Sequence, residues 1–243
     1  MGCTRDRTLG KIHAIALLCV LIQWNGKGNL IGKYMVQIIQ ASDLSLHQVK
    51  ERFNLQKVWD DQFFWEWQDE LSEINDHERH WLDRVKDDFL SLAEYPLHEE
   101  VVKLSVLAPL LSLAGLTRFP FIPVAEKQVE VTFEEDDQII RGRIDLLILH
   151  QQLWAVVVES KAKKLDVMEA LPQALFYIMT NLNPDRATFG LLMNGNNFMF
   201  VKVAQQETSK YALSELFTLF RRENDLYRVL SILKRLKDLV QPG

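Results

Sequence analysis

The segment from Leu153 to Glu159 restricts the fold more than any other part of the chain. It reads Leu-Trp-Ala-Val-Val-Val-Glu, so an extended backbone would be apolar on both sides. A strand of this kind is buried on both faces, which places it inside a sheet rather than at an edge. Helices are predicted before and after the strands around it. We therefore expect an α/β protein with a mixed central sheet flanked by helices.

The strand-rich block extends from residue 128 to residue 203 and contains one helix. Its apolar residues alternate with polar ones or form short runs between turns, as in strands. The predicted strands are Gln128–Phe133, Ile139–Leu149, Leu153–Glu159, Thr188–Met193 and Asn197–Val203. Asp166-x-x-Glu169 is a capping pattern, which predicts a helix from there to about Thr180.

Two capping boxes predict helices near the start of the regular sequence. They are Ser45-x-x-Gln48 and Asn75-x-x-Glu78, in which the first side chain and the fourth can each satisfy a free backbone N–H group. The helix after the second box carries an apolar stripe formed by Trp81, Val85, Phe89 and Leu92. Its charged residues fall on the opposite face, which we interpret as solvated.

Two further helices are predicted, one on each side of the strand-rich block. Glu99–Leu113 is rich in apolar residues and reads as a buried helix that bends or breaks near Pro109 and stops at Gly115. Leu213–Val240 reads as an amphipathic helix.

The N-terminus differs from the rest of the chain. A few basic residues precede the apolar run Ile12–Trp24, which gives some of the form of a signal peptide. No small-x-small cleavage site follows, and the run is shorter than the roughly 20 residues that span a bilayer. We interpret this segment as an extension ahead of a start at Met35. A signal or anchor, and a packed helix, are the alternatives.

These patterns divide the chain into four segments. Residues 1–34 are the N-terminal extension, and residues 35–97 form a helical N-terminal region. Residues 98–205 hold the α/β core, and residues 206–243 form a C-terminal helical segment.

Charge is distributed unevenly along the chain. The net charge is −5, which disfavours a generally basic nucleic-acid binder. Residues 60–100 carry 14 acidic residues against three basic ones, and residues 186–243 carry nine basic residues against five acidic ones. The first segment therefore has a net charge of −11 and the second +4. A local surface for a polyanion remains compatible with this distribution.

Cysteine usage and missing motifs exclude several classes. The two cysteines, Cys3 and Cys19, form no Cys/His cluster, so neither a disulfide framework nor a structural zinc site is predicted. We expect a reduced, cytoplasmic setting. The sequence contains no GxxxxGK[ST] motif, so no nucleotide cofactor and no ATP-driven motor are expected.

Three polar residues interrupt the apolar strands. Asp145 lies within the second predicted strand, and Glu159 and Lys161 end the third. A carboxylate in such a place is costly to bury unless it is paired or binds a cation. If the two strands are neighbours, Asp145 and Glu159 converge and offer the oxygen ligands that Mg²⁺ takes. An exposed salt bridge is the alternative interpretation.

This set resembles the PD-(D/E)XK nuclease superfamily, whose core has the order αβββαβ. Asp145 is followed after 13 residues by Glu159-x-Lys161, and Gln173-x-x-x-Tyr177 lies on the next helix, as in the QxxxY element of RecB-like nucleases. Ile144 stands where the name of the superfamily gives proline.

The upstream segment extends the resemblance. Glu99-Glu-Val-Val-Lys103, followed by Pro109-Leu-Leu, is similar to the N-terminal nuclease domain of type I restriction enzyme R subunits. The resemblance spans about residues 35–203 and is closest to small stand-alone cyanobacterial proteins of that kind. It implies a restriction-endonuclease-like αβββαβ core with helical N- and C-terminal extensions.

The resemblance also implies roles for individual residues. Asp145 and Glu159 would hold Mg²⁺, or Mn²⁺ in its place, with Glu99 and the backbone carbonyl of Ser160 completing the site. Lys161 would position the attacking water and stabilise charge in the transition state. The residues expected to contact nucleic acid are Gln173, Tyr177, Arg141 and Arg143. Gln173 and Tyr177 would contact phosphate or orient Lys161, and the alternative is a core tyrosine and a polar helix residue. For the two arginines the alternative is an ordinary surface position. Glu100 replaces Glu99 if the helix is rotated by one residue, and a solvated role is the alternative for either.

Two functions are carried forward. The first is a Mg²⁺-dependent deoxyribonuclease that hydrolyses DNA phosphodiester bonds with a metal-activated water. The second is a catalytically inactive module of the same fold that binds nucleic acid or a protein partner. DNA is the expected partner, a partner protein or homodimer is left open, and a membrane is disfavoured.

One aromatic cluster stays open between two interpretations. It consists of Trp59, Phe63, Phe64, Trp65 and Trp67. Packing against the core is the favoured interpretation, and a surface on which bases stack is the alternative.

Overall fold

One mixed sheet organises the molecule. The computed structural model describes residues 37–133, 138–150, 153–160 and 166–240. Within these ranges the strands are β1 (Gln37–Gln40), β2 (Gln56–Lys57), β3 (Phe121–Phe133), β4 (Gln138–His150), β5 (Leu153–Ser160), β6 (Thr188–Met193), β7 (Asn197–Gln205), β8 (Ser209–Leu213) and β9 (Phe217–Thr218). Their order in the sheet is β1-β4-β5-β6-β7-β8-β2, with β3 also paired to β4 and β9 to β7. The predicted internal strand is confirmed, since β5 has a neighbour on each side.

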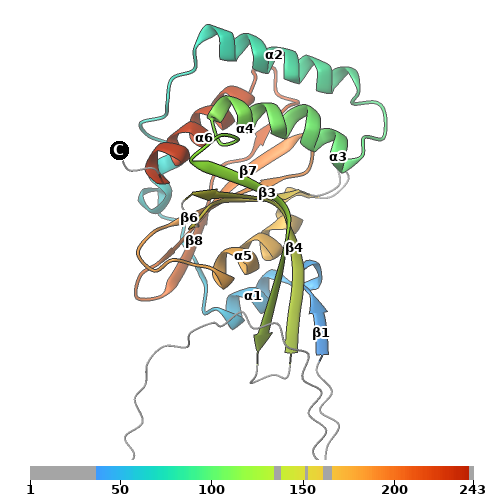
Figure 1. Cartoon of the computed structure of the whole chain (residues 1–243). Helices are drawn as coiled ribbons and strands as arrows, with labels where there is room; N and C mark the ends of the chain where they lie inside the picture. Colours follow the sequence, from blue (N-terminus) through green and yellow to red (C-terminus); the bar gives the residue numbers. More distant parts are fainter. Residues whose placement is uncertain (1–36, 134–137, 151–152, 161–165, 241–243) are drawn as a thin grey trace, which may run out of the picture.

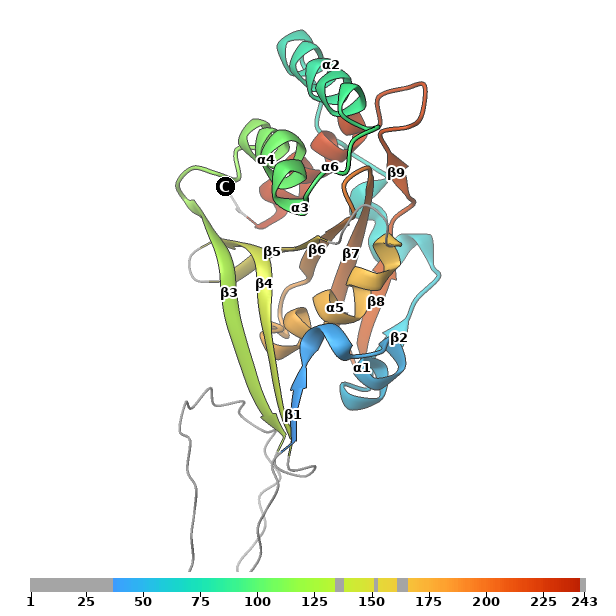
Figure 2. The ribbon, with the colours of Figure 1, turned by 90° about the vertical axis from the view of Figure 1, so that its right-hand side faces the viewer.

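Helices cover both faces of this sheet (Figure 1 and Figure 2). They are α1 (Leu46–Arg52), α2 (Asp76–Ser91), α3 (Glu99–Val102), a π-helical turn (Lys103–Leu107), α4 (Ala108–Ala114), α5 (Leu171–Thr180) and α6 (Leu226–Val240). Short 3₁₀ segments occur at Ala41–Asp43, Asp61–Trp67 and Val167–Ala170. Helices α2, α4 and α6 lie on one side of the sheet, and α1 and α5 on the other. The expected α/β architecture is confirmed.

Each face of the sheet has its own hydrophobic core. Phe89 of α2, Leu110 of α4 and Leu233 of α6 belong to the first core, which also takes side chains from β6 and β7. Val49 of α1 and Phe176 of α5 belong to the second core. The sheet is therefore buried on both sides, as the apolar strands require.

Strand β4 changes both its neighbours and its faces near Asp145. Its edge pairs with β1 up to Arg141 and with β5 from Leu146 onward, while its other edge follows β3 throughout. Ile144 contributes to the core around α5, whereas Leu146, also at an even position, packs on the opposite core. On β3 the facing residue, Glu126, has a φ of +54°, a left-handed conformation that is uncommon outside glycine. The two strands therefore switch faces together at this point.

Helix α5 packs closely on β4 at Gly142. A Cβ atom built on Gly142 would lie 2.7 Å from Cβ of Ala41 and 2.9 Å from Cε1 of Tyr177, and closer still to the Tyr177 hydroxyl. The absence of a side chain lets the helix and the 3₁₀ segment approach the strand. Gly142 is therefore a point of close approach between the backbone of β4 and α5.

The capping patterns are confirmed, and the apolar stripe of α2 needs a correction. Both capping boxes form, at Ser45 and at Asn75. In α2, however, Trp81 is 45% exposed, and Leu82 takes its place beside Val85 and Phe89. The buried face of the helix is therefore rotated by about one residue from the predicted stripe.

The predicted helix from Leu213 to Val240 is wrong over its first half. Leu213 ends β8, β9 follows, and α6 begins only at Leu226. Both short strands pair with β7 and bury apolar side chains such as Phe217, so tertiary pairing overrides the helical pattern. The sheet therefore continues past the predicted boundary at residue 205.

The region 35–97 is also less purely helical than predicted. It contributes β1, which pairs with β4, and β2, which pairs with β8 at the far edge of the sheet. In addition, the strand predicted from Gln128 starts at Phe121, because β3 follows β4 along its whole length. These segments became strands through pairing partners that are distant in the sequence.

Within the described ranges, no helix has the length and apolar character needed to cross a membrane. The apolar run Ile12–Trp24, which raised the alternative of an anchor, lies outside the described residues.

The packing at Gly142 gives a test of the fold. We expect Gly142→Ala to lower the free energy of unfolding by about 1–3 kcal/mol, because the added methyl group overpacks the contact with Tyr177. In a double-mutant cycle with Tyr177→Phe, which removes the nearest atom, the two losses should be less than additive. Urea denaturation of the four proteins measures this. Additive losses, or no loss in Gly142→Ala, would contradict the packing.

Candidate functional site

The predicted carboxylates lie on neighbouring strands. The antiparallel ladder between β4 and β5 runs from His150–Leu153 to Leu146–Val158, and the next residues on the two strands are Asp145 and Glu159. Only the backbone of β5 is described, so the side chain of Glu159 lies outside the described part of the chain. The topology nevertheless brings the two positions to one end of the ladder, where β4 switches faces.

A lysine joins Asp145 to the upstream glutamate. Nζ of Lys103 lies 2.8 Å from Oε1 of Glu99 and 3.4 Å from Oδ1 of Asp145. The side chains of Lys103 and Asp145 are 20% exposed, and that of Glu99 is 30% exposed. Two carboxylates from different elements thus approach one cationic group in a partly buried place.

The alternative glutamate has a different environment. Glu100 also lies 3.4 Å from Nζ of Lys103, but its side chain is 78% exposed. Glu99 is therefore the glutamate that shares Lys103 with Asp145 below the surface, and Glu100 extends toward solvent.

The charges around Lys103 fix its protonation state. Burial of the ammonium would by itself lower the pKa of Lys103, but the hydrogen bond to Glu99 and the charges of Asp145, Glu99 and Glu100 outweigh it. Together they raise the pKa to about 12. Lys103 is therefore a permanent positive charge at neutral pH.

The helix that carries this lysine is irregular at the same place. The predicted helix over 99–113 forms as α3, a π-helical turn that starts at Lys103, and α4, whose first turn contains Pro109. Proline cannot donate a hydrogen bond to the preceding turn, which explains the expected irregularity. The helix ends at Gly115 with a left-handed φ of 76°, as predicted. Single π turns of this kind are frequent at functional sites.

The remaining members of the predicted metal site are less fully placed. Ser160 is the last residue of β5 and pairs with Met193 of β6. Lys161, the predicted catalytic lysine, lies outside the described residues. Its proposed role therefore stays a prediction.

The structure buries the Gln173 and Tyr177 pair. Nε2 of Gln173 donates a hydrogen bond to the Tyr177 hydroxyl over 3.0 Å, and the two residues are 8% and 0% exposed. A contact of this pair with phosphate stays a prediction, and in the structure Tyr177 packs against Gly142 of β4.

The two arginines of β4 form ion pairs with glutamates of β3. Nε of Arg141 lies 2.6 Å from Oε2 of Glu130, an ion-pair contact that lacks hydrogen-bond alignment. Arg143 lies 3.5 Å from Glu126. Both arginines are at least 40% exposed, so a phosphate can compete with these carboxylates. Arg143 is the nearer of the two to Asp145, at roughly 7 Å along the strand.

The side chains of this site are of the type that binds a hard cation. Asp145 and Glu99 supply carboxylate oxygens, which are the ligands of Mg²⁺, and they already converge on one positive charge. Within the described part of the chain no group of three or more His, Cys, Asp or Glu side chains is arranged to hold a metal ion. The side chain of Glu159, the third carboxylate of the predicted set, lies outside this part of the chain.

Sequence reasoning assigned no role to Lys103. The available signal was its spacing of four residues from Glu99, which places the two side chains on one face of a helix. Its contact with Asp145 depends on the packing of this helix over β4, which the sequence pattern does not specify.

Comparison with known proteins adds no family to this geometry. No protein-family model matches the sequence, and no curated protein sequence matches it as a relative.

The lysine bridge predicts a specific loss of stability. We expect Lys103→Met to lower the free energy of unfolding by about 1–3 kcal/mol, because it leaves two partly buried carboxylates without their cation. Glu100→Gln is the matched control, and its exposed pair should contribute less than about 0.5 kcal/mol. Urea denaturation compares the three proteins.

The same variants carry a pH test. The pKa of Lys103 is raised in the folded state to about 12, so its stabilising effect is complete below the unfolded value near 10.4 and fades only as the pH rises through 12. The loss of unfolding free energy caused by Lys103→Met should therefore be equal at pH 7 and pH 9. A cost no larger than that of Glu100→Gln would contradict the bridge.

Proposed function

We propose that this protein is a Mg²⁺-dependent nuclease that hydrolyses phosphodiester bonds in DNA. The observation that carries the proposal is the convergence of Glu99 and Asp145 on one cation position beside the end of the β4–β5 ladder, where Glu159 follows. Phosphodiester hydrolysis at a carboxylate-held metal requires such a convergence of oxygen ligands.

The order and direction of the elements support the proposal. A helical segment (α3 to α4) is followed by β3, β4 and β5, then by α5 and β6. Neighbouring strands are antiparallel from β3 to β5, and β6 is parallel to β5. This arrangement has the αβββαβ order of the restriction-endonuclease-like core that the sequence resembles.

The residues would divide the work as follows. Asp145, Glu159 and Glu99, with the carbonyl of Ser160, would hold Mg²⁺, which when bound supplies a Lewis acid and lowers the pKa of its water. Lys161 would orient the attacking water and stabilise the charge that develops on the phosphate. Lys103 would hold Glu99 and Asp145 at one place before the cation arrives.

The electrostatics of the surroundings also support a polyanionic substrate. Arg143 lies on the same strand as Asp145, and its pair with Glu126 is exposed and weak. The strongly acidic segment 60–100 contains α2, which packs with α4 and α6 on one side of the sheet. A DNA backbone would therefore follow the sheet edge rather than α2.

A second candidate is an inactive module of the same fold that binds DNA or a protein. The observation that favours it is Lys103 itself, because a lysine between two carboxylates already neutralises them without a metal. In that case the cluster would be a structural ion pair.

A cleavage assay tests the nuclease proposal. The full chain should cut DNA in the presence of Mg²⁺ or Mn²⁺ and not in the presence of a chelator. Lys161→Ala and Asp145→Asn should each lower the rate by about 100-fold or more, as expected for loss of a catalytic group. Glu100→Gln should cleave like the parent.

Circular dichroism would establish that each variant is folded. Cleavage that is unchanged in Lys161→Ala and Asp145→Asn would contradict the proposal. A folded parent chain that binds DNA but does not cleave it would favour the second candidate.

A further inference from the structure

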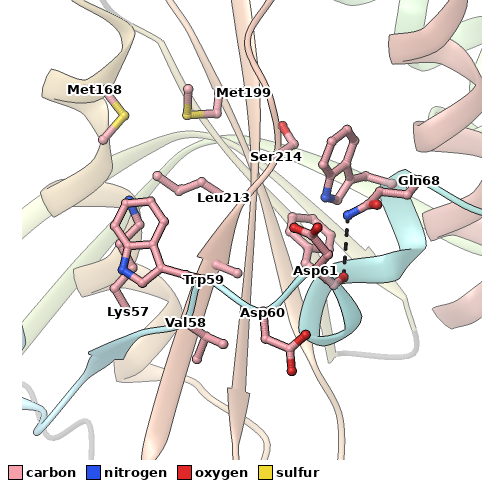
Figure 3. A pocket seen from close by; sticks show the side chains of 13 residues that line it. Lys57, Val58, Trp59, Asp60, Asp61, Gln68, Met168, Met199, Leu213 and Ser214 are labelled. Atoms are coloured by element: carbon pink, nitrogen blue, oxygen red, sulfur yellow. Dashed lines mark hydrogen bonds between the residues drawn. The ribbon is translucent and has the colours of Figure 1, made fainter.

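A pocket of about 310 Å³ lies at one end of β8 (Figure 3). Neither Asp145 nor Glu99 lines it. Leu213 and Ser214, at the end of β8, line it together with Met199 of β7. The segment after β2 closes another side with Trp59, and Met168 approaches from the 3₁₀ turn before α5. Its volume is at the lower end of the range for ligand sites, roughly 300–1,000 Å³.

The pocket and the proposed catalytic site lie at the same end of the parallel strands of the sheet. Strands β5 and β6 are parallel, and β7 is antiparallel to both β6 and β8, so the carboxyl ends of β5, β6 and β8 lie at the same edge. Glu159 is near the end of β5, and Leu213 ends β8. Three strand spacings separate β5 from β8, which is about 14 Å. One bound strand of nucleic acid can therefore reach both.

The pocket presents an open aromatic ring. Trp59 is 81% exposed, although the neighbouring Phe64 is buried in the core. Nζ of Lys57 lies 3.6 Å from the centre of the Trp59 ring and covers one face of it. The high exposure leaves the other face accessible, and Met168 and Met199 supply polarisable apolar walls nearby. A flat aromatic ligand fits this combination.

Lys57 supplies positive charge beside this ring. Burial, and then the positive charge of Lys50, lower the pKa of Lys57. Lys210 lies farther away, near the start of β8, where it faces Gln56 of β2 in the strand register. An aromatic ring beside a lysine can stack a base and hold the adjacent phosphate.

The acidic residues of the pocket narrow the ligand further. Oδ1 of Asp60 accepts a hydrogen bond from the backbone N–H of Gln62, and Asp61 also lines the pocket. A carboxylate only accepts hydrogen bonds, so it can bind an N–H group of a base, such as the amino group of adenine or cytosine, and it repels the phosphate.

We infer that this pocket binds an unpaired base of single-stranded DNA, stacked on Trp59, with its phosphate near Lys57. The inference extends the proposed function, because it assigns a substrate contact on the β8–β2 side of the sheet, several strands away from Asp145 and Glu159. Strand binding at this pocket needs neither the metal nor cleavage.

Fluorescence anisotropy with a short labelled oligodeoxyadenylate, in a chelating buffer at low salt, tests the inference. Trp59→Ala should weaken binding about tenfold, the usual effect of removing one stacked base contact. Trp59→Phe should retain most of the affinity. Trp81→Ala is the matched control, since Trp81 is also partly exposed but lies on α2, and its affinity should stay within about twofold of the parent.

The outcomes separate this inference from the nuclease proposal. Equal affinity in the parent and in Trp59→Ala, equal losses in the two alanine variants, or no binding by the parent would each overturn the pocket. None of these results depends on cleavage. Loss of cleavage in Asp145→Asn with unchanged oligonucleotide binding would support both proposals.

Discussion

Strand β4 has to exchange β1 for β5 along one edge without leaving β3, and the two helical layers depend on that exchange. Before Asp145 the strand packs its even residues against α5, with Gly142 lying directly on Tyr177. After Asp145 the even residues face the layer of α2, α4 and α6. Glu126 takes a left-handed conformation opposite the change. Because Asp145 lies at the point where the strand changes faces, its carboxylate is not buried in either hydrophobic core.

The same switch explains why charged groups collect there. Asp145 meets Lys103 of the π-helical turn, and Lys103 also holds Glu99. Mutual attraction outweighs the cost of burial for this lysine, so Lys103 stays charged between the two carboxylates. The arrangement suits a site in which the two carboxylates bind a divalent metal ion, and it equally suits a permanent ion pair. Function is decided by what Glu159 and Lys161 add to it.

Much of this arrangement follows from local sequence, and the rest follows from pairing. The apolar run before Glu159 specified an internal strand, and Gly115 specified the end of a helix, because each depends on residues close in the chain. The strands β8 and β9, the arginine pairs with β3 and the contact of Lys103 with Asp145 depend on partners far apart in sequence. The exposure of Trp59 beside buried Phe64 likewise depends on how the chain leaves β2.

The measurement that tests the central claim most directly is calorimetric titration of Mn²⁺ into the full chain, compared with Asp145→Asn and Glu159→Gln. Mn²⁺ takes the same oxygen ligands as Mg²⁺. If the carboxylates of β4 and β5 form one metal site, the parent should bind Mn²⁺ with a defined stoichiometry, and each substitution should abolish that binding. Equal binding in all three proteins, or no binding in the parent, would contradict the assignment of these residues as a metal site.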